Sequence, residues 1–271
     1  MDVQPSKRID KEILRRVQFK ELELLSAVHQ LCIKHGIQYF MIHGTLLGAV
    51  KYKGFIAWDD DIDIGMMRKD FQIFEHYANE LPKNMFLQTP KTDPQTPTQV
   101  AKLRLNGTKF ITDSTDESKN YHKGIPIDIF VFDYYPGWTK VVECALNFVP
   151  DLKQKRKRWH KGSWQRVIFG VLIAPLYWIH SFFQKIWVKC VTPLFRGNAN
   201  CDFIGQESIL NNGEYWEKQD IFPLINLQFE NQVFMAPNAH MKYLQKHYGV
   251  NFMTYTPSDN EQHWHAKEII L

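Results

Sequence analysis

The sequence predicts an α/β or α+β domain: a mixed sheet flanked by helices, with a basic, aromatic helical insertion. Three observations predict it. Near the start of the chain, apolar residues recur at the spacing of an amphipathic helix. Short apolar segments typical of strands then alternate with helical segments, and a stretch rich in Lys, Arg and aromatic residues interrupts this alternation. With 271 residues, 44% of them hydrophobic, the chain can bury a sizeable core, which excludes disordered and fibrous classes.

The first elements follow from local spacing. Apolar residues between positions 9 and 31 recur at steps of three and four, which predicts a long helix that ends near Gly36. Residues 38–42 form a short apolar run, typical of a strand. Thr45 is expected to cap a short helix that runs to Val50.

Later elements alternate in the same way. Asp61 to Ile64 alternates polar and apolar residues, which predicts a strand, and residues 68–81 return to helical spacing. Further strands are predicted at Val100 to Leu105, Lys109 to Ile111 and Ile125 to Phe132, with Asn106-Gly107 as a hairpin turn between the first two. A last helix is expected from Ala239 to Tyr248.

Charge divides the chain unevenly. The net charge is +4, from 33 basic and 29 acidic residues, but Leu152 to Cys201 carries ten Lys or Arg and no acid, which leaves 23 − 29 = −6 for the rest. We therefore expect a core domain over residues 1–144, a basic aromatic helical insertion over 145–200, and a C-terminal part over 201–271 that completes the core.

The insertion allows two interpretations. Basic residues beside aromatic ones are typical of a segment on an anionic membrane surface, whereas a helical hairpin packed in the core would have a similar composition. A spanning helix is not expected, because the longest apolar run, Val167 to Ile179, is short and contains Gly170 and Pro175. Nucleic acid is not an expected partner, since no motif for it is found and the clustered carboxylates would repel its backbone.

The most informative segment is acidic: Trp58-Asp59-Asp60-Asp61-Ile62-Asp63-Ile64. Residues two apart in a strand share a face, so Asp61 and Asp63 can converge on one site while the isoleucines enter the core. Carboxylates of this kind suit Mg²⁺ or Mn²⁺, held together with substrate phosphates. Asp128 lies between isoleucines on another predicted strand. The alternative is a solvated acidic turn.

A possible phosphate site lies upstream. His43-Gly44-Thr45-Leu46-Leu47-Gly48 joins a predicted strand to a helix, where free backbone N–H groups and the helix dipole bind phosphate.

These segments together resemble the LicD family, which includes the fukutin-type transferases. The resemblance rests on HGTLLGAVKYKGFIAWDDDIDIGMMRKDF, AKLRLNGTKFI, GIPIDIFVFD and NFMTYTPSDNEQHWH. It implies a nucleotidyltransferase-like fold and transfer of a phospho-alcohol, best known as phosphocholine, from a CDP-activated donor to a glycan hydroxyl. It also implies that Gly44 and Thr45 contact donor phosphate, that Asp61 and Asp63 hold metal, and that Asp128 is the third catalytic and metal-binding carboxylate. The family more often has glycine where this chain has His43.

Other side chains are weaker candidates. Lys51 and Arg104 carry charges that suit a diphosphate, against the alternative of ordinary surface cations. Residues expected near the substrate are His43, Asp59, Asp60, Glu117, His263 and His265. The last two could also bind zinc, but no third ligand has a suitable spacing.

We therefore expect a metal-dependent phosphotransferase. Its donor would be a CDP-choline-like compound, and its acceptor a lipid-linked precursor of a cell-surface polysaccharide such as teichoic acid or lipopolysaccharide. The expected location is cytoplasmic, at the inner face of the membrane. Two alternatives stay open: a nucleotidyltransferase that adds NMP to an acceptor, and a non-catalytic membrane-surface binding protein.

Overall fold

The computed structural model describes residues 10–138, 200–206, 215–254 and 265–271, together with seven single residues between 178 and 194. The chain divides into two units: Met1–Val131 with Gln219–Leu271, and Phe132–Lys218. The first unit thus joins N-terminal and C-terminal segments, and it carries all of the acidic motif.

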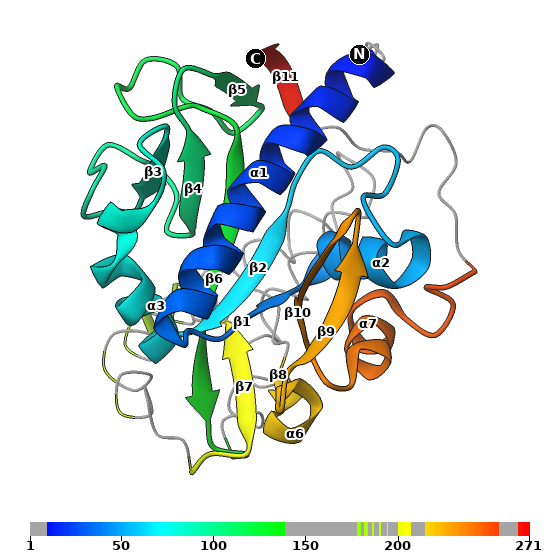
Figure 1. The fold of residues 1–271 in the computed structure, drawn as a ribbon. Coiled ribbons are helices and arrows are strands. Elements are labelled where there is room, and N and C mark those ends of the chain that lie inside the picture. Colours follow the sequence, from blue (N-terminus) through cyan, green and yellow to red (C-terminus); the bar gives the residue numbers. More distant parts are fainter. Residues whose placement is uncertain are drawn as a thin grey trace, which may run out of the picture. The chain divides into compact units, whose positions relative to one another are not determined.

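Helix α1 (Lys11–His35) is the long predicted helix, and it ends at Gly36 as expected, with φ of 65°. Asp10 caps its start by accepting a hydrogen bond from the backbone N–H of Glu12 at 2.8 Å. Most of its apolar residues are buried, although Phe19 and Ile33 are exposed, and Figure 1 shows α1 lying across one face of the sheet.

The central sheet of the first unit has the strand order β1-β2-β6-β4-β3. Pairing is antiparallel between β1 and β2, between β4 and β6, and between β3 and β4. The bounds are β1 (Tyr39–Met41), β2 (Asp63–Met67), β3 (Met85–Gln88), β4 (Ala101–Leu105) and β6 (Pro126–Tyr135). These findings confirm a mixed α/β architecture, although β3 was not predicted.

Two helices follow the first two strands. Helix α2 (His43–Tyr52) begins three residues earlier than expected, with Ile42 at its N-cap, so the prediction that Thr45 caps it is wrong. The Thr45 hydroxyl instead accepts a hydrogen bond from the backbone N–H of Asp63 at 2.7 Å, which fastens α2 to β2. Helix α3 (Arg68–His76) is followed by a short 3₁₀ turn, η1 (Ala78–Glu80).

The expected hairpin between residues 100 and 111 does not form. Gly107 makes a turn with φ of 76°, but β5 (Lys109–Thr112) pairs with the C-terminal strand β11 (Ala266–Ile270) and not with β4. Strand β4 already has β3 and β6 on its two edges, so no edge remains for β5. The Asn106-Gly107 pair therefore predicted the turn correctly but did not predict which strand pairs with β5.

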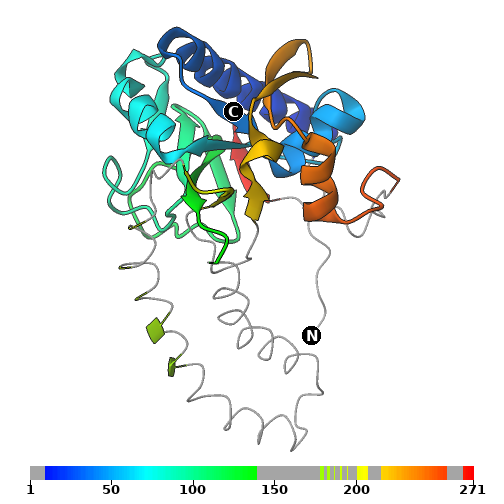
Figure 2. The ribbon, with the colours of Figure 1, turned by 90° about the horizontal axis from the view of Figure 1, so that it is seen from below.

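The C-terminal part of the first unit covers α2. A hairpin of β9 (Ile225–Phe229) and β10 (Gln232–Ala236) is joined to α7 (His240–Tyr248), which confirms the predicted last helix. Figures 1 and 2 both show α7 beside α2. This packing brings residues from the end of the chain to the helix that follows β1.

The second unit contains the C-terminal end of β6, which pairs with β7 (Phe203–Gln206), and β7 in turn pairs with β8 (Tyr215–Glu217). Helix α6 (Lys218–Ile221) follows β8. Most of the predicted insertion lies outside the described residues, and the proposed boundaries at 144 and 200 stay predictions. Among the described residues, no helix is long and apolar enough to cross a membrane.

Candidate active site

The acidic motif is a loop that leads into a strand. Asp59, Asp60 and Asp61 precede β2, and only Asp63 belongs to the strand, so the predicted strand begins two residues later than expected. The Gln18 amide on α1 holds this loop by donating to the carbonyls of Ile56 (3.2 Å) and Asp59 (2.8 Å). Because these hydrogen bonds hold the segment as a loop, Asp59, Asp60 and Asp61 do not have to alternate between two faces as residues of a strand do.

The apolar residues of the motif behave as predicted. Ile62 and Ile64 are fully buried. Their burial fixes the loop on the core, which argues against a freely solvated acidic turn.

Asp60 fastens the C-terminal strand to the acidic loop. Its fully buried carboxylate accepts hydrogen bonds from the backbone N–H groups of His265 and Ala266, both at 2.9 Å. It also contacts Nδ1 of His265 at 2.8 Å, and this hydrogen bond raises the pKa of His265. Asp60 therefore positions His265 and does not itself line the pocket described below.

His43 is held in an unusual backbone conformation at the start of α2. Its φ is +44°, a region that favours glycine, so strain is stored at this position. Nδ1 of His43 lies 3.2 Å from Oδ2 of Asp63, and the ring stacks on His247 with centroids 4.7 Å apart. The tertiary contacts of the ring thus hold a backbone geometry that a glycine would adopt without strain.

The two glycines of the upstream motif allow close packing. A Cβ on Gly44 would lie 2.7 Å from Oδ2 of Asp59, and a Cβ on Gly48 would lie 2.5 Å from the carbonyl oxygen of Gly54. The first contact brings the N-terminal turn of α2 against the acidic loop. The second brings the middle of α2 against the turn that follows it.

Negative charge is concentrated and only partly compensated here. Burial raises the pKa of Asp59 to about 6, and burial together with the charges of Asp63 and Asp59 raises the pKa of Asp61 well above its usual range. Glu21 on α1 is fully buried, has no hydrogen-bond partner among the described residues, and has a strongly raised pKa because of burial and the nearby aspartates. A bound cation would relieve this repulsion.

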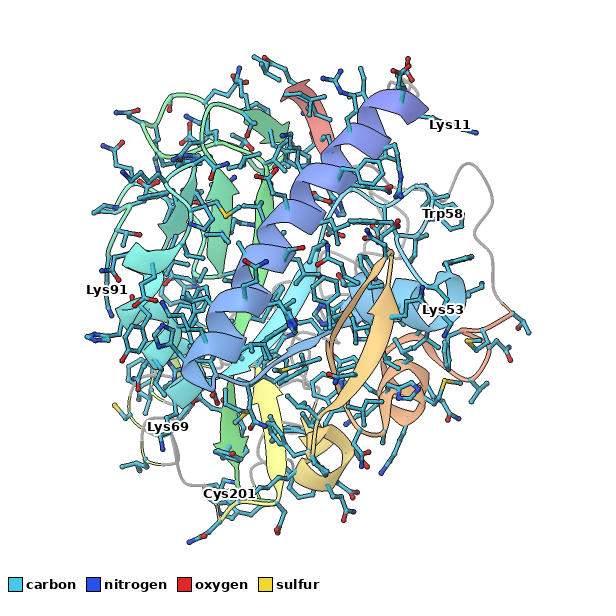
Figure 3. The ribbon with its side chains drawn as sticks, viewed as in Figure 1. Lys11, Lys53, Trp58, Lys69, Lys91 and Cys201 are labelled. Carbon is cyan, nitrogen blue, oxygen red and sulfur yellow. The ribbon has the colours of Figure 1, made fainter. Side chains whose placement is uncertain are left out.

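A pocket of about 540 Å³ opens between α2, the acidic loop and the C-terminal segment. It brings together seven of the predicted site residues: His43, Gly44, Lys51, Asp59, Asp61, Asp63 and His265. The rest of its lining is Leu47, Tyr52, Ile56, Trp58, Tyr248, Asn251 and Phe252. Figure 3 shows Trp58 in the loop between α2 and β2.

Asp128 lies next to the acidic loop but outside the lining of the pocket. Its backbone N–H donates to the carbonyl of Ile62 at 2.8 Å, and its carboxylate is held by the Lys102 ammonium at 2.5 and 2.6 Å. Burial raises the pKa of Asp128, with Lys102 opposing the shift. The structure therefore brings Asp128 within electrostatic reach of the motif but gives it a lysine partner.

Arg104 is not brought to the pocket. The side chain is buried, with 7% of the residue exposed, and its guanidinium donates to Oε1 of Gln88 and to the carbonyl of Gly124. Burial lowers the pKa of Arg104 to about 10, so the group stays charged at neutral pH. Both hydrogen-bond partners of the Arg104 guanidinium belong to the protein interior, so this arginine stabilises the fold.

Two further candidates also lie away from the pocket or cannot be placed. Glu117 is an exposed acid whose carboxylate lies 3.8 Å from the ammonium of Lys109. His263 lies outside the described residues.

The donor chemistry of the pocket fits a magnesium-type ion. Among the described residues, no group of three or more His, Cys, Asp or Glu side chains is arranged to hold a metal. Mg²⁺ is, however, commonly held by one or two carboxylates together with substrate phosphates and water. Asp61 and Asp63 supply two such carboxylates in the lining of the pocket.

Sequence reasoning missed several residues of the pocket. Tyr248 is the last residue of α7, Asn251 and Phe252 follow this helix, and no local pattern links the three to the acidic loop. Trp58 was recognised only as a neighbour of the aspartates. Lys102 was missed as the partner of Asp128, although both lie opposite each other in the register of β4 and β6.

Comparisons with known proteins show which sequences this chain is similar to. Residues 36–145 match the family model described as LicD/FKTN/FKRP, nucleotidyltransferase domain. The chain is similar to the lipopolysaccharide cholinephosphotransferase LicD of Haemophilus influenzae, with 28% identity over 95% of this chain and 98% of that protein. An uncharacterized protein of Rickettsia typhi is 48% identical over 61 residues, which are 22% of this chain and 19% of that protein.

Proposed function

Because the chain carries, in residues 36–145, the nucleotidyltransferase domain of the LicD/FKTN/FKRP family, we propose that it transfers phosphocholine, or a related phospho-alcohol, from a CDP-activated donor to a hydroxyl of lipopolysaccharide or another cell-surface glycan. The relative from Haemophilus influenzae, a lipopolysaccharide cholinephosphotransferase by name, supports phosphocholine as the transferred group and lipopolysaccharide as the acceptor. The pocket carries the proposal, because it joins the N-terminal turn of a helix to a cluster of carboxylates.

The first turn of α2 is the proposed site for the donor phosphates. Its backbone N–H groups and helix dipole favour negative charge, and no acidic residue lies in this turn. Gly44 in this turn lines the pocket, and Lys51 adds a positive charge near the other end of the same helix. The contact of Thr45 with donor phosphate stays a prediction, because its hydroxyl holds Asp63 in the structure.

The transfer is a substitution at phosphorus. The acceptor hydroxyl oxygen forms a bond to the phosphorus of the phospho-alcohol, the bond from that phosphorus to the phosphate oxygen of CMP breaks, and the hydroxyl proton passes to a carboxylate of the cluster. Asp61 and Asp63 would hold Mg²⁺ or Mn²⁺, which supplies positive charge to the phosphate groups. Asp128 is the proposed third carboxylate, oriented by Lys102.

The test uses the purified full chain with CDP-choline, Mg²⁺ and a lipopolysaccharide acceptor. Asp61→Asn and Asp63→Asn are each expected to lower transfer by about 100-fold or more, and to weaken Mn²⁺ binding measured by calorimetry. Asp113→Asn is the matched control, because Asp113 is an exposed aspartate away from the pocket. Full activity in both pocket variants would exclude this site.

A second candidate function is transfer of NMP itself, which the description of the matched domain favours. The mass of the product separates the two reactions: the acceptor gains phosphocholine in one and a nucleoside monophosphate in the other.

Attachment to an anionic membrane is a further part of the proposal. Among the single residues described between 178 and 194, Trp178 is 80% exposed and Leu194 is 72% exposed, and Phe182 and Phe183 are also exposed. Ten basic residues without an acid occupy residues 152–201. Exposed aromatic side chains and excess positive charge are what an anionic leaflet attracts.

Vesicle flotation tests this attachment. The full chain is expected to float with vesicles that contain phosphatidylglycerol and not with neutral ones, and Trp178→Ser with Phe182→Ser is expected to reduce flotation. Equal flotation with both kinds of vesicle would contradict the electrostatic part of the proposal.

A further inference from the structure

Four of the residues that line the pocket are aromatic. Tyr52 is the last residue of α2, Trp58 lies in the loop before β2, and Tyr248 and Phe252 come from the end of α7 and the segment after it. Tyr52 and Tyr248 are 42% and 43% exposed, so parts of their rings face solvent beside the pocket. Four aromatic residues in a pocket that also contains three aspartates need an explanation beyond core packing.

The relative orientation of two of these rings suits a rounded group better than a flat one. The rings of Tyr52 and Trp58 lie with centroids 6.5 Å apart and planes at 76°. Two nearly perpendicular planes form a corner, whereas a nucleotide base stacks best on a parallel ring face or between two of them. A corner of this kind gives a compact, roughly spherical group two aromatic surfaces at once.

The charges around these rings favour a positively charged ligand group. The face of an aromatic ring carries a partial negative charge, and it attracts cations. In the structure, the Lys51 ammonium lies 5.3 Å from the centroid of the Tyr52 ring, so this ring already accepts a positively charged nitrogen. Asp59 and Asp61 line the same pocket and add negative potential.

We propose that the corner formed by Tyr52 and Trp58 binds the trimethylammonium group of a choline-containing donor. The proposal rests on the proposed function and deepens it, because it assigns the residues that choose the alcohol. A trimethylammonium group has no N–H to donate, so ring faces and diffuse negative charge suit it, whereas a primary ammonium requires hydrogen-bond acceptors. A neutral polyol such as ribitol gains nothing from the rings.

Calorimetric titration of the full chain with four ligands tests the assignment: CDP-choline, CDP-ethanolamine, CDP-ribitol and CMP, each with Mg²⁺. Trp58→Leu and Tyr52→Leu are expected to weaken CDP-choline by about 3- to 30-fold. Binding of CDP-ribitol and CMP is expected to change by less than about twofold. Tyr52→Phe keeps the ring and is expected to bind CDP-choline like the unaltered chain.

The matched control is Phe19→Leu. Phe19 is an exposed aromatic residue on α1 that faces the Arg15 guanidinium at 4.2 Å, so it is also a ring beside a cation, but it does not line the pocket. Its replacement is expected to leave the binding of all four ligands unchanged. Thermal melting of every variant verifies that the fold is kept.

Three results would overturn the assignment. Equal weakening of all four ligands would mean that the rings stack on cytosine. Unchanged CDP-choline binding in both leucine variants would remove the rings from recognition, while continued phosphocholine transfer would leave the proposed function intact. Failure of the unaltered chain to bind or use CDP-choline would refute the proposed function and this assignment together.

Discussion

Replacing Arg104 with methionine tests whether this arginine supports the fold or binds donor phosphate. The guanidinium donates to Gln88 and, at 2.6 Å, to the carbonyl of Gly124, in a side chain that is almost fully buried. A hydrogen bond from a charged donor contributes about 1.5–3 kcal/mol. Methionine retains much of the apolar stem, so we expect a loss near the lower limit for two bonds, about 3 kcal/mol.

This loss corresponds to a Tm lower by about 6–12 °C for a chain of this size. Urea unfolding followed by tryptophan fluorescence and thermal melting both measure it. Arg104→Lys keeps the charge but cannot donate in the same fork, so an intermediate loss is expected. The reasoning is refuted if Arg104→Met melts within 2 °C of the unaltered chain (a limit of about 0.5–1 kcal/mol) and binds CDP-choline much more weakly, since that pattern belongs to a phosphate ligand.

Three further predictions concern stability. Glu21→Met removes a buried carboxyl that has no hydrogen-bond partner in the described part of the chain, and it is expected to stabilise the metal-free protein by about 1–3 kcal/mol in urea unfolding. Because the folded-state pKa of Glu21 is raised, its stability contribution is greatest at low pH and is lost as pH rises, so the variant should gain most at neutral pH. Gly48→Ala places a Cβ 2.5 Å from the carbonyl oxygen of Gly54 and is expected to cost about 1–3 kcal/mol, seen as a lower Tm; an unchanged Tm would show that the turn yields freely. Glu230 accepts two hydrogen bonds from Arg15, which lower the pKa of Glu230, so its contribution to folding stability is present above the unfolded pKa and is lost as pH falls. Glu230→Gln is therefore expected to lower the free energy of unfolding by up to about 1 kcal/mol at pH 7 and by less at pH 3.

Local elements could be predicted because their signals are local. The apolar repeat of α1 and the glycine at its end lie within one stretch of sequence, as do the buried isoleucines of the acidic motif. The same holds for the last helix, α7. Spacing along the chain predicts such features because the helix and strand periods themselves decide which side chains are buried.

The predictions were wrong where they concerned the strand or hydrogen-bond partner of a residue distant in sequence. Asn106-Gly107 predicted a turn, but β5 pairs with β11, more than 150 residues further along the chain. Threonine commonly caps helices, yet the Thr45 hydroxyl accepts a hydrogen bond from the backbone N–H of Asp63 and so joins α2 to β2. These outcomes depend on which strand edges and donors remain available after the sheet has formed, and nothing near the turn or the threonine encodes that.

The sequence by itself determined the acidic motif, the glycine motif at the start of α2 and the family resemblance, since each is a short pattern of residue types whose chemistry is the same in any fold. Only the tertiary structure decided which candidates meet. It brought His265 to the aspartates through buried Asp60 and gave Asp128 a lysine partner. It also buried Arg104 away from the pocket and added Tyr248, at the end of α7, and Phe252, beyond α7, to the pocket lining. Such contacts join segments up to about 200 residues apart, and chain packing sets them.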